Sequence, residues 1–226
     1  MLRLALYSRD CLRQLRDETG ISYQAQQKGI LHFYRNPKEL HKNKVRAQRM
    51  AELGCPFRSL SPIEAADIEP ALDKVRSQIA GGLYYPEDES GDAYVFTQNL
   101  MDLCKNLRVE FMFGTNISAL AAKGGNFTRI ETDKGILSAD AVVLALGSYS
   151  PALTRPLGLN LPVQPVKGYS ITLPVLADQS APRISLVDNE RKLVFSRFGD
   201  RLRVAGMAET DGFDTSVDQV RARSIL

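Results

Sequence analysis

The chain of 226 residues is long enough for one large domain or two small ones, and its 44% hydrophobic and 24% charged residues are typical of a soluble globular protein. A net charge of +3 is too balanced for a nucleic-acid-binding surface. Three cysteines without a CxxC spacing argue against disulfides or a thiolate zinc site. The two histidines, His32 and His41, lack suitable partners for metal or nucleophilic chemistry, so we assign them surface roles. The sequence contains neither a transmembrane-length apolar run nor a signal peptide.

The N-terminal part of the chain predicts a helix followed by a hairpin. Residues 2–19 have apolar side chains at helical spacing, and Gly20 has the character of a helix C-terminus. Residues 21–34 alternate loosely between β-branched and aromatic residues around Gly29, which indicates a β-hairpin. We therefore expect one long helix that leads into two paired strands.

Three further helices are expected before residue 108. Asn36-Pro37 is a typical helix start, and Gly54 is a typical stop. Residues 61–64 have the spacing of a capping box. Residues 81–96 favour a strand, a long loop and a short strand, after which Thr97 caps the next helix.

From residue 109 the pattern changes to strands. Residues 123–126 have the composition of a hairpin turn. Residues 141–146 are a continuous apolar run that ends at Gly147, which is typical of a strand buried in a parallel-type sheet. The expected strands are 109–113, 117–122, 127–132, 141–146, 163–173, 183–187, 193–198 and 201–207. The predicted fold class is therefore α/β (α+β), with a mixed or antiparallel sheet flanked by helices.

Both ends of the sequence have the pattern of interrupted elements. The chain begins in a helical pattern, and residues 216–226 form a helix-like stretch without a terminal cap. These ends predict an internal fragment of a longer protein, with 216–226 as the start of a truncated helix. The sequence also has no GxGxxG or GxxxxGK[ST] motif, so a nucleotide-binding domain would lack its phosphate-binding opening within this chain.

Three stretches are candidates for chemistry, and each has a structural alternative. Gly147 allows a phosphate or sugar to approach the backbone closely, or it simply turns the chain after a core strand. Lys167 and Tyr169 are either pocket residues or a snorkelling edge lysine and a packed tyrosine. Arg197 is either a solvated strand residue or, if it faces a cavity, a planar guanidinium suited to a carboxylate.

In this order, several stretches resemble the small-subunit family of flavin-dependent D-amino acid dehydrogenases, within the glycine oxidase-like and D-amino acid oxidase-like flavoproteins. The resemblance covers essentially the whole chain. It rests on MLRLALYSRDCLRQLRDETGI at the start, GGLYYPEDESGDAYVFT at 81–97, ADAVVLALGSYSPAL at 139–153, PVKGYSITLPV at 165–175 and LVFSRFGDRLRVAGMAETDGFD at 193–214. Family members have a GxGxxG segment before the matched region and a second flavin-binding segment after it.

The resemblance implies an FAD-binding fold with an interleaved substrate domain. Residues 1–108 would be the helical part of the substrate domain, and 151–215 would provide its sheet. Residues 109–150 would be an inserted piece of the FAD-binding domain.

The resemblance also implies roles for individual residues. The backbone at Ile117 would lie near the adenine, and Ala145, Leu146 and Gly147 would lie along the FAD pyrophosphate and ribose. Arg197 matches the position of a substrate-carboxylate arginine in glycine oxidase-like relatives. Lys167 and Tyr169 are further candidates for the substrate pocket.

The chemistry implied is oxidative deamination. A D-amino acid such as D-alanine transfers its Cα hydrogen as hydride to the flavin N5, and the imine hydrolyses to a 2-oxo acid and ammonia. A fragment that lacks the GxGxxG segment is expected to bind FAD weakly or not at all and to be inactive. Two alternatives stay open: a glycine or sarcosine oxidase-like enzyme that reduces oxygen, and a flavin-free β-rich binding domain.

The resemblance further implies a bacterial cytoplasmic enzyme that passes electrons to a respiratory acceptor such as a quinone. Such an enzyme would associate peripherally with the cytoplasmic face of the inner membrane. The densest basic stretch, residues 38–49, spreads over more than one face of a helix. We therefore interpret it as a solvated helix, without a role in membrane binding.

Overall fold

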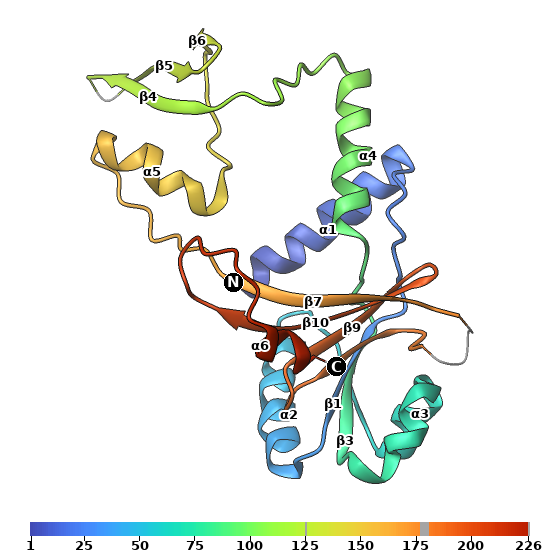
Figure 1. The fold of residues 1–226 in the computed structure, drawn as a ribbon. Helices are drawn as coiled ribbons and strands as arrows, with labels where there is room; N and C mark the ends of the chain where they lie inside the picture. The colour runs from blue at the N-terminus through green and yellow to red at the C-terminus, as the bar shows by residue number, and fades with distance from the viewer. Residues whose placement is uncertain (125, 177–180, 226) are drawn as a thin grey trace. The chain divides into compact units, whose positions relative to one another are not determined.

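The computed structural model describes residues 1–124, 126–176 and 181–225 (Figure 1). Gly125, in the predicted hairpin turn, and Leu226, in the predicted C-terminal helix, lie outside the described residues. The chain forms two compact units. Unit 1 consists of Met1–Leu107, Gly168–Ala208 and Val217–Leu226, and unit 2 consists of Arg108–Lys167 and Glu209–Ser216.

The main sheet has seven strands in the order β2-β3-β1-β8-β9-β10-β7, so it combines strands from both ends of the sequence. Its strands are β1 (Ile30–Tyr34), β2 (Arg58–Leu60), β3 (Gly81–Tyr85), β7 (Lys167–Pro174), β8 (Ser185–Asp188), β9 (Leu193–Phe198) and β10 (Arg201–Glu209). Strands β8, β9 and β10 form an antiparallel meander. The prediction of a mixed sheet flanked by helices is confirmed.

Strand β1 occupies the middle of this sheet and corrects the predicted hairpin. It pairs antiparallel with β3 and parallel with β8. The preceding residues form no strand, and only a single bridge joins Gln26 to Ser90. Gly29 has a φ of 71°, and a side chain there would overlap the Tyr84 ring. Two distant partner strands therefore replace the local partner that the sequence suggested.

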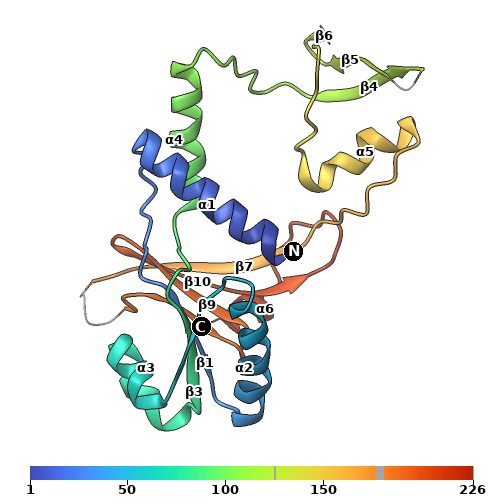
Figure 2. The same cartoon turned by 180° about the vertical axis from the view of Figure 1, so that it is seen from behind.

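The alternation of β1 separates two apolar clusters on opposite faces of the sheet. Leu31 and Phe33 face α3 (Pro62–Ile68) and the 3₁₀ helix Pro70–Gln78, within the largest core cluster. Tyr34 packs against Ala47 of α2 (Pro37–Ala51) on the other face. Figure 2 shows β1 and β3 between α2 and α3. The core therefore lies in layers, with the sheet between helices.

Local capping explains where the first helices begin and end. Helix α1 (Leu2–Thr19) stops at Gly20, which adopts a φ of 65°. Asn36 caps α2, and its side chain accepts a hydrogen bond from the backbone N–H of Lys38. Ser61 and Glu64 form a reciprocal capping box at the start of α3. These three sequence predictions are confirmed.

Helix α4 (Ala93–Asn106) begins earlier than the sequence suggested. The Asp92 carboxylate accepts hydrogen bonds from the backbone N–H groups of Tyr94 and Val95, at 3.0 and 3.2 Å. Thr97, the expected cap, lies inside the helix and donates its hydroxyl to the Ala93 carbonyl. The expected short strand before residue 97 is therefore wrong, because a carboxylate cap at residue 92 extends the helix over it.

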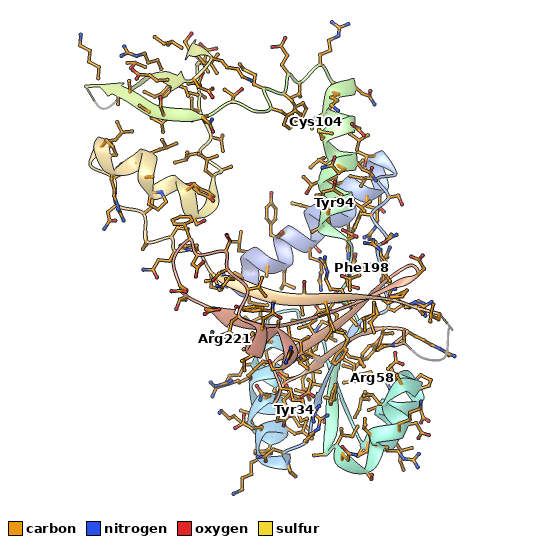
Figure 3. The ribbon with its side chains drawn as sticks, in the orientation of Figure 1. Tyr34, Arg58, Tyr94, Cys104, Phe198 and Arg221 are labelled. Atoms are coloured by element: carbon orange, nitrogen blue, oxygen red, sulfur yellow. The ribbon has the colours of Figure 1, made fainter. Side chains whose placement is uncertain are left out.

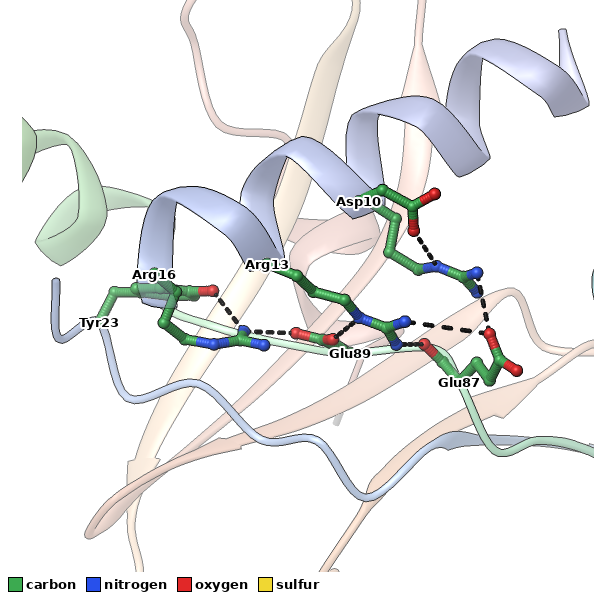
Figure 4. A network of polar contacts seen from close by, with 7 residues as sticks. Asp10, Arg13, Arg16, Tyr23, Glu87 and Glu89 are labelled. Carbon is green, nitrogen blue, oxygen red and sulfur yellow. Dashed lines mark hydrogen bonds and ion pairs between the residues drawn. The ribbon is translucent and has the colours of Figure 1, made fainter. Parts of the chain in front are cut away.

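A row of arginines attaches α1 to the loop after β3, although no residue of α1 is fully buried. Arg13 and Arg16 both bind the Glu89 carboxylate, and Arg16 also donates to the Tyr23 hydroxyl at 2.9 Å (Figure 4). Arg9, one helical turn earlier, pairs with Glu87 at 2.8 Å. Because Arg9, Arg13 and Arg16 are spaced by three to four residues, they lie on one helix face.

Unit 2 contains a small antiparallel sheet of β4 (Ile117–Lys123), β5 (Asn126–Thr132) and β6 (Gly135–Leu137). Short helical turns cover Gly147–Tyr149, Ser150–Thr154 (α5) and Arg155–Leu157. Residues 109–113 and 141–146, both expected to be strands, form none in the described chain. Val143 is 88% exposed, so the second segment is not the buried strand that its apolar run predicted. An apolar run forms a strand only where neighbouring strands satisfy its backbone.

The remaining helix, α6 (Gln219–Arg223), packs against the end of the main sheet. Asp218 caps it through the backbone N–H groups of Val220 and Arg221. Ile225 and Ala222 contact a second core cluster formed by Tyr169, Leu193 and Val204.

Glu69 provides a test of how the sheet is held together. Its side chain is 1% exposed, and its carboxylate accepts from the backbone N–H groups of Ala71, Arg183 and Ile184 at 3.0, 2.6 and 3.0 Å. We predict that Glu69→Ala lowers the free energy of unfolding by about 3 kcal/mol or more, because one buried and two partly buried backbone donors lose their acceptor. Urea denaturation measures this change.

The exposed Glu52→Ala serves as the matched control and should change the stability by less than about 0.5 kcal/mol. Glu69→Gln keeps one acceptor oxygen and should fall between the two. Equal stability of Glu69→Ala and Glu52→Ala would contradict the assigned role of the carboxylate.

Candidate functional site

An open groove of about 690 Å³ lies over β7, β9 and β10 in unit 1. Its walls include Gly168 and Ser170 from β7, Val194 from β9, and Arg203 and Ala205 from β10. Strand pairing places Ala205 opposite Val194 and Arg203 opposite Ser196, so these side chains share one face of the sheet. Small residues leave room there for a planar or apolar group beside a cation.

Arg203 is the strand residue that supplies this cation. Its side chain is exposed, and its Nε lies 3.5 Å from the Thr172 hydroxyl of β7. The guanidinium therefore keeps most of its donors for a ligand carboxylate. Arg203 was not among the site residues predicted from the sequence. The alternation of β10 could have indicated it, because Arg203 and the small residue Ala205 are two positions apart and so lie on the same face of the strand.

Two neighbouring residues in the groove have strained backbones. Lys192, in the turn before β9, has a φ of 58°, and Met207, in β10, has a φ of 62°. They flank the pair Leu193 and Gly206, so the strain is concentrated at one end of the groove. Left-handed conformations of side-chain-bearing residues are enriched at ligand sites, where the surrounding structure maintains them.

Tyr169 has a structural place at this site. Its ring packs with Leu193 and Val204 in the cluster beneath α6, and its hydroxyl accepts from the backbone N–H of Asp218 at 3.3 Å. The tyrosine also lines the groove. Tyr169 thus connects β7, which borders the groove, to α6, which covers the opposite face of the sheet.

The other two predicted substrate residues lie elsewhere. Arg197 is half-buried near the far end of β9, where its Nε donates to the Gly199 carbonyl at 3.0 Å. Since Arg197 and Leu193 are four residues apart, roughly 13 Å of strand separates Arg197 from the strained end of the groove. Lys167 belongs to unit 2, where its ammonium donates to the Ser216 carbonyl and pairs with Glu209 at 3.5 Å. Of the three, the groove includes Tyr169 alone.

The predicted FAD contacts lie in unit 2 and are accessible. Ile117 begins β4 and is 38% exposed, and Leu146 is 39% exposed. Ala145 is also exposed, in the extended segment before the helical turn. Gly147 adopts a φ of 53°, and no atom lies within 4 Å of the position that a Cβ would occupy. A ligand could therefore approach the Gly147 backbone closely, which fits the predicted contact with a phosphate or sugar.

The surface role predicted for His32 is wrong, whereas His41 is exposed as predicted. His32 lies on β1, and burial lowers its pKa below the usual value. The His32 and Tyr85 rings pack edge-on with their centroids 5.3 Å apart. The His32 Nδ1 lies 3.3 Å from the side-chain nitrogen of Asn189. The neutral imidazole is therefore an interior group of the sheet face that packs against α1 and α2.

An α/β unit built on a mixed seven-stranded sheet, interrupted in sequence by a small β-rich unit, defines the class of fold, and similarity to known proteins specifies the family. The family model described as "FAD dependent oxidoreductase" matches residues 1–226, so the chain belongs to this family. A D-amino acid dehydrogenase of Paramagnetospirillum magneticum is 48% identical over 225 residues, and one of Vibrio cholerae is 42% identical over 225 residues. The match includes the whole chain but only 53% of each relative, so the chain spans about half their length.

Solved structures support the fold. The L-proline dehydrogenase from P. horikoshii superposes with a TM-score of 0.87 at 18% identity, over 99% of this chain and 60% of that protein. Glycine oxidase from Geobacillus kaustophilus gives 0.84 at 23% identity, over 96% of this chain and 58% of that protein. The resemblance stated from the sequence is confirmed at the level of family and fold.

The backbone strain in the groove can be tested through Lys192. Lys192→Gly and Lys192→Ala both remove the charge, but only glycine relieves the left-handed strain. We predict that Lys192→Gly is more stable than Lys192→Ala by about 1 kcal/mol. Chemical denaturation of the two variants measures the difference, and an alanine variant at least as stable as the glycine variant would contradict it.

Proposed function

We propose that this chain forms part of an FAD-dependent D-amino acid dehydrogenase, in which a D-alanine-like substrate is oxidised to a 2-oxo acid and ammonia. The observation that supports it best is 42–48% identity, over essentially the whole chain, to relatives bearing that name. Because the chain spans about half of those relatives, the activity is proposed for the full-length enzyme. The reaction consumes water and delivers two electrons to an acceptor, for which we propose a respiratory quinone.

We propose that unit 2 contributes to FAD binding through Ile117, Ala145, Leu146 and Gly147. The openness of the Gly147 backbone and the exposure of Leu146 support this role. When bound, FAD supplies the two-electron acceptor for the substrate. The residues of this chain would position the cofactor and leave the redox chemistry to it.

We propose that the groove of unit 1 binds the substrate, whose carboxylate needs a cationic partner. Arg203 is supported by its position among small side chains, and Arg197 is supported by the sequence resemblance. Lys167 and Tyr169 remain further candidates, Tyr169 acting through the position of β7. A bidentate arginine would fix the carboxylate and so orient the Cα hydrogen.

Among the described residues, no helix combines the length and apolar character required to cross a bilayer. We propose that the full-length enzyme contacts the cytoplasmic face of the inner membrane peripherally, where its quinone acceptor is dissolved. This location follows from the proposed electron acceptor.

The two arginines are distinguished by kinetics in the full-length enzyme. We predict that substitution of the carboxylate-binding arginine by glutamine lowers kcat/KM for D-alanine, because the substrate carboxylate loses its partner. The expected decrease corresponds to a loss of about 2–4 kcal/mol of transition-state stabilisation. Arg203→Gln should show this loss if the groove binds substrate, and Arg197→Gln should show it if the resemblance holds residue by residue. Unchanged kcat/KM in both variants would contradict the proposed carboxylate site.

A second prediction concerns the cofactor. The 226-residue chain should bind FAD weakly, because its sequence has no GxGxxG turn to hold the pyrophosphate. Each missing charge-assisted hydrogen bond removes about 1.5–3 kcal/mol. Purification followed by flavin absorbance measures the occupancy, with the full-length enzyme as the control. Stoichiometric FAD on the 226-residue chain would contradict the prediction.

A further inference from the structure

A second cavity, of about 680 Å³, lies in unit 1 between α1, α2 and the face of the sheet that carries His32. Leu2, Leu6 and Leu12 of α1 form one apolar wall, and Met50 of α2 extends it. The opposite side is polar and includes His32, Tyr85 and Asp88. The cavity shares no lining residue with the groove over β7, β9 and β10. Its volume lies in the range of small-molecule sites.

Two polar groups of this cavity, the Tyr85 hydroxyl and the Asp88 carboxyl, have hydrogen-bonding capacity that the described residues do not use. Arg9 also lines the cavity, but its Nε is buried within the protein and its guanidinium pairs with Glu87 at 2.8 Å. The Asp88 carboxyl is half-buried and forms no hydrogen bond or ion pair within the described chain. The Tyr85 hydroxyl likewise has no hydrogen-bond partner among the described residues. Buried polar groups in folded proteins are normally paired.

His32 adds a donor of defined orientation. The Asn189 side-chain nitrogen lies 3.3 Å from Nδ1, and an amide nitrogen can only donate, so Nδ1 accepts and the proton lies on Nε2. Burial favours this neutral form by lowering the His32 pKa. Tyr34, on the same strand face, is 2% exposed and adds a second phenol to the lining (Figure 3). Burial raises its pKa to about 12, so its hydroxyl stays protonated.

The unpaired groups specify a ligand with two opposite functions. Tyr85 and His32 offer O–H and N–H donors, which suit a carboxylate. Asp88 offers a carboxyl for a hydrogen-bond donor, and burial, partly opposed by Arg9, raises its pKa. An ammonium near Asp88 would favour the ionised carboxylate again. The leucines and Met50 fit an aliphatic side chain.

We propose that this cavity is a binding site for a zwitterionic amino acid with an apolar side chain, separate from the proposed substrate groove. The carboxylate is bound by the Tyr85 and His32 donors, and the ammonium is bound by Asp88. The apolar wall formed by α1 and Met50 takes the side chain. This site is additional to the proposed oxidation chemistry, and it requires no cofactor.

The test uses the 226-residue chain and isothermal titration calorimetry with three probes of similar size. L-Leucine carries both charges, 4-methylpentanoate lacks the amine, and 3-methylbutan-1-amine lacks the carboxylate. D-Leucine is titrated as well, so that the result does not depend on configuration. We expect one enantiomer of leucine to bind at least tenfold more tightly than either single-charge probe. Equal or weaker binding of leucine, or no binding of either enantiomer, would overturn the proposal.

Two variants locate the site. Tyr85→Phe removes one donor and should weaken leucine and 4-methylpentanoate by about tenfold or more. Its matched control is Tyr84→Phe, because Tyr84 lies on the opposite face of β3 and donates its hydroxyl to the Lys28 carbonyl at 2.8 Å. Asp88→Asn should abolish the preference for leucine over 4-methylpentanoate, while each variant's thermal unfolding verifies that it is folded.

Arg203→Gln separates this site from the groove and should leave leucine binding unchanged. Loss of leucine binding in Arg203→Gln, with wild-type affinity in Tyr85→Phe, would place the ligand in the groove and overturn the proposal. Because the readout is binding to the 226-residue chain, failure of this proposal leaves the kinetic test of the oxidation chemistry unaffected.

Discussion

The parallel pairing of β1 with β8 is the constraint on which unit 1 depends. It joins three strands from the first 85 residues to four strands that follow residue 166, across the intervening unit 2. Charged groups reinforce both ends of this junction. Glu69 binds the backbone at the start of β8, and Arg35, just after β1, pairs with the buried Asp188 at its end. Without this junction, each set of strands would expose an unpaired edge.

The junction forms the cavity beneath α1, and the strands that follow it form the groove. The antiparallel meander that follows β8 presents Arg203 in a groove of small side chains. On the other side, β8 leads to Asn189, which contacts His32 on β1 and so fixes its tautomer within the cavity beneath α1. In the cavity, the polar contact between His32 and Asn189 joins residues 157 positions apart in the sequence, whereas all lining residues of the groove lie between 168 and 208. The cavity therefore requires both halves of the sheet, and the groove is built by the second half.

Helix α1 is attached to the rest of unit 1 mainly by ion pairs, with little apolar burial. It has no fully buried residue, so apolar burial alone holds it weakly. Arg13 and Arg16 converge on the largely buried Glu89, whose pKa they lower against the effect of burial. Such paired, partly buried charges hold the helix over a cavity without filling that cavity with side chains. This arrangement explains how the cavity lined by apolar side chains of α1 stays unfilled although the position of the helix is fixed.

The sequence by itself determined the local features of this protein. Caps at Asn36 and Ser61 and the stop at Gly20 are set within a few residues, because their hydrogen bonds are local. The family was also recognisable from the order of its motifs. Tertiary structure decided the partners of β1, the exposure of residues 141–146 and the set of polar groups around His32. The physical reason is that apolar periodicity indicates which side chains are suited to burial, but it does not determine which distant segment covers them.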